Sequence, residues 1–211
     1  HNWAGHQLKY TMGIMDYEEE VHESSWGSAT VFFPVNRDQE FKQTSHELQI
    51  SSDSDGPLNY VAGFYYLEAD SYITSGPIQP FTVNHEAEAQ AFYGELTYDL
   101  NDAWSITLGA RYTEEDKSMQ TYSWPPVVGD PDRIAGNIDP SVLQMAATPE
   151  FSDDNLTYRA VIQRNFSKGM VYASYSTGFR SGGFFNRGTS PAEVEPYDSE
   201  EVDSIEIGLR S

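Results

Sequence analysis

Apolar and polar side chains alternate with a period of two along most of the chain, and helical periodicity is nearly absent. The alternation is clearest in two neighbouring segments, 92–100 and 104–112. One side of the first carries Phe92, Leu96, Tyr98 and Leu100, and one side of the second carries Trp104, Ile106, Leu108, Ala110 and Tyr112. A polar turn separates the two segments, so the pattern predicts a β-hairpin with one apolar face.

Segments with the same alternation recur before and after this hairpin. They cover roughly residues 8–19, 41–52, 58–74, 156–166, 170–183 and 202–210. Together with the hairpin they predict an all-β fold, an antiparallel meander of about eight strands. Short connections (SDSDGP, LNDA and FSKG) alternate with long ones (residues 21–40, 75–84, 122–154 and 186–199). We therefore expect short turns at one end of the sheet and long loops at the other.

This asymmetry between the two ends is typical of outer-membrane barrels, which have short periplasmic turns and longer extracellular loops. A soluble β-sandwich also alternates and also has loops of uneven length. Aromatic residues favour the barrel, because they gather at two levels along the strands, as two interfacial girdles would. The lower level comprises Tyr60, Tyr98, Trp104, Phe166 and Tyr172, and the upper level Tyr66, Tyr112, Tyr175 and Phe179.

The net charge of the chain argues against one class of binding partner. The 211 residues include 33 acidic and 12 basic side chains, a formal net charge of -21, so nucleic acid is not an expected partner. The chain has no cysteine, which excludes disulfides and thiolate chemistry. Because it contains no apolar run of the roughly 18 residues that a membrane helix needs and no basic segment followed by an apolar run, we expect neither a spanning helix nor a signal peptide within residues 1–211. Because the sequence begins at His1 and stops within a strand-like pattern, we interpret it as a fragment.

No catalytic or metal-binding constellation emerges from the motifs. Three His-Glu pairs begin at His22, His46 and His85, but none has a second histidine one helical turn later. The acidic segment from Asp130 resembles a calcium loop, yet it places Ile134 where a ligand is needed and lacks the closing glutamate. We therefore expect no enzyme activity, no cofactor and no resident metal.

The sequence VYASYSTGFRSGGFFNRG, residues 171–188, together with the later VDSIEIGLRS, resembles a strand pair of TonB-dependent outer-membrane receptors. FKQTSHELQISS, LNYVAGFYYLEAD, AFYGELTYDLNDAWSITLGARYTEEDKS and LTYRAVIQRNFS resemble the preceding strands of that family in the same order. The resemblance implies part of a large transmembrane β-barrel of about 22 strands with a plugged lumen. It also implies that the family's plug domain and last strands lie outside residues 1–211.

The resemblance divides side chains between lipid and lumen. Lipid-facing candidates are Leu96, Tyr98, Trp104, Ile106, Leu108, Tyr112, Ile205 and Ile207, and lumen-facing candidates are Glu95, Arg111, Arg159, Tyr172, Arg180 and Glu206. Gly182 and Gly183 would let their strand bend as it leaves the membrane. The loop at 122–154 would contribute to ligand choice.

The function implied is capture of a scarce ligand, most often a ferric siderophore or similar iron complex, at the outer membrane of a Gram-negative bacterium. The expected partners are the lipid bilayer, the protein's own plug and the TonB energy-coupling complex. An alternative is a soluble or surface carbohydrate-binding module in which Trp26 and Trp124 stack on sugar. A small outer-membrane barrel enzyme is a third possibility, but no Ser-His pairing supports it.

Overall fold

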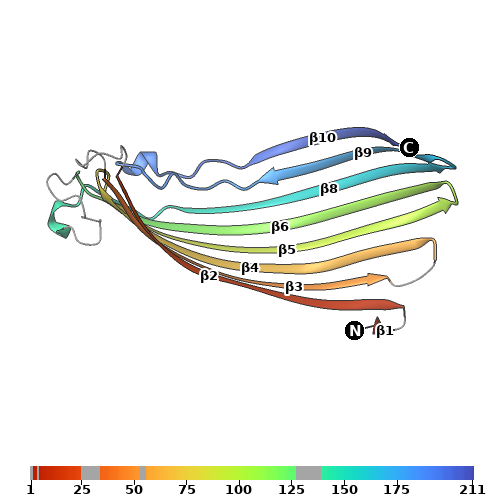
Figure 1. The fold of residues 1–211 in the computed structure, drawn as a ribbon, viewed down its shortest axis with the longest axis horizontal. Helices are drawn as coiled ribbons and strands as arrows, with labels where there is room; N and C mark the ends of the chain where they lie inside the picture. Colours follow the sequence, from red (N-terminus) through yellow and green to blue (C-terminus); the bar gives the residue numbers. More distant parts are fainter. Residues whose placement is uncertain (1, 4, 25–33, 53–55, 127–138) are drawn as a thin grey trace.

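The computed structural model describes the chain except residues 1, 4, 25–33, 53–55 and 127–138. Within the described residues, long strands follow one another in chain order in a single curved sheet (Figure 1). The strands are β1 (Asn2–Trp3), β2 (His6–Ser24), β3 (Pro34–Ser52), β4 (Leu58–Pro77), β5 (Phe81–Asn101), β6 (Trp104–Ser123), β7 (Met145–Ala147), β8 (Glu150–Phe166), β9 (Gly169–Arg180) and β10 (Glu200–Arg210). Two 3-10 turns, η2 (Pro140–Val142) and η3 (Pro191–Glu193), lie in the connections.

Every pairing among these strands is antiparallel, and the sheet order follows the chain, with short β7 attached to β6 beside the main path. The predicted all-β meander is therefore confirmed: it has eight long strands, β2–β6 and β8–β10, among the described residues. The two helical elements of the described chain are single 3-10 turns, so neither has the length to cross a bilayer.

The predicted hairpin forms between β5 and β6. Leu96 pairs with Leu108 and Tyr98 pairs with Ile106, so large apolar residues of the two strands share one face. The side-chain oxygen of Asn101 accepts hydrogen bonds from the backbone N–H groups of Ala103 and Trp104, at 3.0 and 3.1 Å, which closes the tight turn.

Tight turns lie at one end of the sheet and longer connections at the other (Figure 1). The strands nevertheless reach further toward the second end than alternation predicts. The expected long loop at 75–84 is wrong, because β4 continues to Pro77 and β5 begins at Phe81. The expected loop at 122–154 likewise contains the end of β6, η2, β7 and the start of β8, and its residues 127–138 lie outside the described chain.

The buried core is small and lies at this loop end. Five buried side chains form it: Phe81, Val83, Met119, Met145 and Val194. Large apolar side chains elsewhere on the sheet are mostly exposed, as Ile14 at 71 % and Ile205 at 78 % illustrate. A sheet that exposes this much apolar surface needs a covering that is not part of the described chain.

Candidate functional site

The pleat gives the sheet two chemically different faces. We call the first the band face, because Leu96, Leu108, Ala160, Tyr175 and Ile205 lie in register across five strands on it. We call the opposite face the pocket face. It carries the residues that alternate with these, such as Glu95, Gly109, Arg159 and Ser176, which also lie in register.

The band face carries a continuous apolar zone over the turn-end half of the sheet. Its members include Leu8, Tyr10, Met12 and Ile14 on β2, Leu48 and Ile50 on β3, Tyr60, Phe64 and Tyr66 on β4, Phe92, Leu96 and Tyr98 on β5, and Trp104, Ile106, Leu108 and Tyr112 on β6. It continues through Leu156, Tyr158 and Ile162 on β8, Val171, Ala173 and Tyr175 on β9, and Ile205, Ile207 and Leu209 on β10. All eight residues expected to face lipid lie on this face.

The six residues expected to face the lumen all lie on the pocket face. Glu95 and Arg159 form an ion pair there, with 3.4 Å between Oε2 and the guanidinium nitrogen. The Tyr172 hydroxyl donates a hydrogen bond to Glu206. The remaining two, Arg111 and Arg180, lie closer to the loop end.

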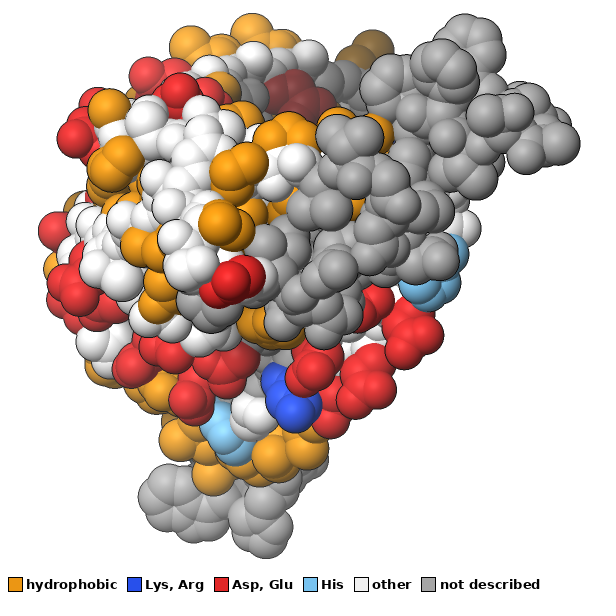
Figure 2. All heavy atoms as spheres, turned by 90° about the vertical axis from the view of Figure 1, so that its left-hand side faces the viewer, with side chains coloured by type: hydrophobic (Ala, Val, Ile, Leu, Met, Phe, Trp, Pro, Cys, Tyr) orange, Lys and Arg blue, Asp and Glu red, His pale blue; other side chains and the backbone are white. Residues whose placement is uncertain are grey.

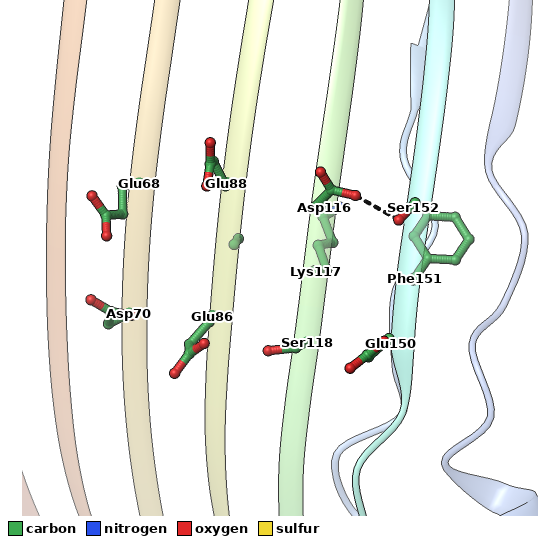
Figure 3. A pocket seen from close by; sticks show the side chains of 11 residues that line it. Glu68, Asp70, Glu86, Glu88, Asp116, Lys117, Ser118, Glu150, Phe151 and Ser152 are labelled. Atoms are coloured by element: carbon green, nitrogen blue, oxygen red, sulfur yellow. Dashed lines mark hydrogen bonds between the residues drawn. The ribbon is translucent and has the colours of Figure 1, made fainter.

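Between the apolar zone and the loop end, the band face carries many acidic side chains. Six carboxylates from four strands line a hollow of about 440 Å³: Glu68, Asp70, Glu86, Glu88, Asp116 and Glu150 (Figure 3). Ser152 Oγ donates a hydrogen bond to Asp116 Oδ1 at 2.5 Å. Lys117 also borders this hollow, but its ammonium group is bound to partners on the pocket face. The acidic hollow therefore repels anionic ligands.

A second hollow, of about 550 Å³, lies on the pocket face near the loop end. It combines His85 of β5, four residues of β6 and the chain from Phe179 to Phe184, with Tyr197 nearby. Its charged lining is Arg111, Lys117, Arg180 and Glu115, three cations against one carboxylate. In a protein with a net charge of -21, this is a local reversal of sign. We refer to it as the cationic hollow.

Figure 2 shows the loop end of the molecule. Acidic side chains predominate on the described surface in that view, and basic ones are few (Figure 2). A cationic hollow within an acidic surround concentrates the local positive potential at one place, where an anionic group would be held.

Two titratable groups inside the cationic hollow have shifted pKa values. Burial, followed by the nearby Lys117 ammonium, holds the pKa of His85 below its ordinary value, so the imidazole is neutral at pH 7. Burial opposes ionisation of Glu115, but hydrogen bonds from Ser181 and Lys117 outweigh it and lower the pKa of this carboxyl. The side chains of Lys117 and Glu115 are 2.9 Å apart as an ion pair.

Aromatic rings contact two of the side chains that line the cationic hollow, Arg111 and His85. The Arg111 guanidinium lies over the rings of Tyr65 and Tyr93, with its carbon 5.5 and 5.8 Å from the ring centroids. The Phe184 ring packs edge-on against His85, with 5.9 Å between centroids. The cationic hollow can therefore offer both charge and flat apolar surface to a ligand.

Sequence reasoning identified only part of this site. The sequence places Arg111 and Arg180 on the lumen side, but it does not identify Lys117 or Tyr197, and it presents His85 only within a His-Glu pair that lacks a metal-binding spacing. The missing signal is spatial, since 64 residues separate Lys117 from its partner Ser181. Of the proposed sugar-stacking residues, Trp26 lies outside the described residues, and Trp124 packs beside Tyr122 with 6.4 Å between ring centroids.

Sequence relatives of this chain are named as receptors. The pesticin receptor of Yersinia pestis is 25% identical over 206 residues, and the match covers 93% of this chain and 28% of the relative. The pesticin receptor of Yersinia enterocolitica matches to the same extent. The chain thus spans a little over a quarter of the length of these curated relatives.

Solved structures share the fold. The ferric yersiniabactin uptake receptor FyuA from Yersinia pestis superposes with a TM-score of 0.76 at 20% identity, covering 97% of this chain and 30% of that one. The siderophore receptor PiuA from Acinetobacter baumannii gives 0.55 at 15% identity, covering 97% and 34%. The family model for the TonB dependent receptor-like β-barrel matches residues 1–211. The chain therefore belongs to the TonB-dependent receptor family, within its β-barrel domain.

Proposed function

We propose that this chain is one part of the wall of an outer-membrane receptor that captures a ferric siderophore or similar anionic iron complex for TonB-dependent uptake. One observation carries the proposal: the same sheet has an apolar zone on its band face and the cationic hollow on its pocket face. A closed barrel gives each face the environment it needs, lipid outside and water inside.

The dimensions of the apolar zone support this orientation. On β8 the band-face residues run from Leu156 to Phe166, ten residue steps or about 33 Å along the strand. With a strand tilt of about 40°, this corresponds to roughly 25 Å, the usual height of the apolar band of such barrels. At the turn end, the Arg164 guanidinium lies over the Trp104 ring at 5.4 Å, an arrangement suited to a membrane interface.

The lining of the cationic hollow supports the proposed ligand class. Three cations and several aromatic rings favour an anionic, partly aromatic ligand over a neutral or cationic one. The names of the relatives, which include a ferric yersiniabactin uptake receptor and a siderophore receptor, support an iron chelate. We assign no chemical conversion to the site, so the ligand would pass through unchanged.

The other partners would contact different parts of the full-length receptor. The bilayer of a Gram-negative outer membrane would cover the apolar zone. A plug domain, encoded outside residues 1–211, would lie against pocket-face residues such as Glu95, Arg159 and Glu206. The TonB complex would act on that plug and not on this wall.

Uptake of radioactive iron by cells that express the full-length protein tests the proposal. The host should lack its own siderophore receptors, and a panel of ferric siderophores should be supplied one at a time. We expect uptake of at least one anionic ferric complex, and loss of that uptake in an otherwise identical strain without the TonB complex. Uptake that is equal in both strains, or no uptake from any complex by correctly inserted protein, would contradict it.

A further inference from the structure

The end of strand β9 leaves its neighbour before either strand stops. β8 and β9 pair from Phe166 and Gly169 up to Arg159 and Ser176. Beyond this point, β8 continues to Glu150 paired with β6, and β9 continues to Arg180 paired with β10. At the fork, the backbone N–H of Tyr158 donates to the side-chain hydroxyl of Thr177, at 2.9 Å, and not to a carbonyl of β9.

The residues that follow β9 are held against the pocket face by contacts with Lys117, Phe151 and Tyr197. The Lys117 ammonium donates to Ser181 Oγ at 2.8 Å and to the Gly182 carbonyl at 3.0 Å. Gly182 is packed so closely that a Cβ atom there would clash with the Tyr197 carbonyl oxygen and the Phe151 ring. The Gly183 backbone exchanges two hydrogen bonds with Tyr197, at 2.8 and 3.2 Å.

The three cations of the hollow differ in the number of hydrogen bonds, ion pairs and ring contacts that they make. Lys117 binds Glu115, Ser181 and Gly182, which accounts for its three donors. Arg111 donates its Nε hydrogen to Thr113 Oγ1 at 3.1 Å and lies over two tyrosine rings. Arg180 is exposed, and its guanidinium forms no hydrogen bond or ion pair with another residue of the described chain.

We propose that residues 177–183 form a strap that presents Arg180 to the anionic groups of the ligand, and that Lys117 is the positioning residue that holds the strap in place. The inference rests on the proposed function, since it assigns roles within the same cationic hollow. In this inference Arg180 contacts the ligand, and Lys117 acts on the ligand only through the position of the strap.

The alternative position of the strap follows from the register. If β9 continued to pair with β8, Leu156 would lie opposite Phe179, and Asn155 opposite Arg180. That pairing would satisfy backbone groups of the upper half of β8, but it would separate Ser181 and Gly182 from Lys117. Loss of the Lys117 contacts should therefore move the strap toward β8 and draw Arg180 away from its place in the hollow.

Disulfide trapping in the full-length receptor tests the position of the strap without any ligand. Cysteines at Leu156 and Phe179 can bridge only when their Cα atoms come within about 7 Å, as continued pairing would bring them. We expect little cross-linking in the L156C/F179C protein and a several-fold higher yield when Lys117→Met is added. Lys117→Arg should restore the low yield in part. Ready cross-linking with Lys117 intact, or no increase in the Lys117→Met protein, would overturn the positioning role.

Binding to the purified full-length receptor tests the role of Arg180. The probes are the trianionic iron(III) tris-catecholate complex and the neutral iron(III) tris-acetohydroxamate complex. Arg180→Gln should weaken binding of the anionic probe by about 10- to 100-fold, as expected for one charged hydrogen bond, and should leave the neutral probe unaffected. Arg180→Lys should retain part of the affinity, and the salt dependence of the association rate should fall in Arg180→Gln.

Together, the cross-linking and binding experiments distinguish an error in the inference from an error in the proposed function. An Arg180→Gln protein that binds the anionic probe as tightly as the wild type overturns the contact role of Arg180. A wild-type receptor that binds neither probe counts against the proposed ligand class, and the cross-linking result then still decides whether Lys117 positions the strap.

Discussion

The hydroxyl groups of Thr97 and Thr107 lie 2.9 Å apart on the pocket face, where they form a hydrogen bond between β5 and β6. Their chain neighbours Leu96 and Leu108 are paired on the opposite face. Adjacent residues of one strand therefore occupy the two environments that the proposed receptor requires, and a matched pair of substitutions can distinguish them.

Leu108→Arg should destabilise the full-length barrel by about 2–4 kcal/mol, because it places a charge in the middle of the apolar zone. Thr107→Arg should cost far less, since its side chain would enter a hydrated lumen near Arg111 and Glu95. Folding of both variants into lipid vesicles, followed by urea titration, measures the difference. Equal costs at the two positions would indicate a sheet that is buried on both faces.

Charge reversal should affect ligand capture on one face only. Arg180→Glu removes an exposed cation from the cationic hollow and adds a carboxylate, so capture of an anionic ferric complex should fall by at least about tenfold. Glu88→Lys, in the acidic hollow of the band face, is the matched control and should leave capture unchanged. A comparable loss in the Glu88→Lys protein would place the ligand on the wrong face for this account.

Acid pH should loosen the packing of Phe184 on His85. The pKa of His85 is lowered, so the imidazole stays neutral as the pH falls to its ordinary value of 6.5 and takes up a proton only below it. The favourable contribution is thus complete above pH 6.5 and is lost as the pH falls through the lowered pKa. Proteolysis within residues 181–199 should therefore accelerate at pH 5 but not at pH 6.5.

The control for this pH effect is His85→Gln, which has no titrating imidazole. Its proteolysis rate should change less between pH 6.5 and pH 5 than that of the wild type. An identical acid response in both proteins would show that another group is responsible.

Val194 ties the connection between β9 and β10 to the small core, because it is buried to 1 % exposure against Phe81, Val83 and Met119. Val194→Ala should weaken this local packing by about 2 kcal/mol and increase amide hydrogen exchange in residues 188–197. Phe185→Ala removes a larger side chain that is 54 % exposed, so exchange should hardly change. The reverse ranking would argue against Val194 as the anchor.

The sequence predicts the turn-end half of this sheet well, because the band face and the pocket face differ in polarity and successive residues of a strand alternate between them. In β6, Ile106, Leu108 and Tyr112 alternate with Thr107 and Arg111, and the pairing with β5 is as expected. Toward the loop end the same strand reads TEEDKSMQTYS, in which polar residues occupy both faces. Alternation disappears there although the strand continues to Ser123. The connection expected at 75–84 is likewise shorter than predicted, because β4 continues to Pro77 and β5 begins at Phe81.

The cationic hollow was only partly predictable for a different reason. Arg111 and Arg180 could be assigned to one face by counting along their strands. The convergence of Lys117 with Ser181, and of His85 with Phe184, depends on the fork between β8 and β9. Nothing in the alternation of either strand indicates that their pairing ends at Arg159 and Ser176.

Labelling of single cysteines along β6 tests most directly the claim that the band face meets lipid and the pocket face meets water. Each residue from 105 to 111 in turn would be replaced by cysteine in the full-length receptor, with any other cysteine removed, and exposed in outer-membrane vesicles to a membrane-impermeant maleimide. We predict protection at the even positions 106, 108 and 110 and greater labelling at the odd positions 105, 107, 109 and 111. Uniform labelling, or labelling confined to the even positions, would contradict the account.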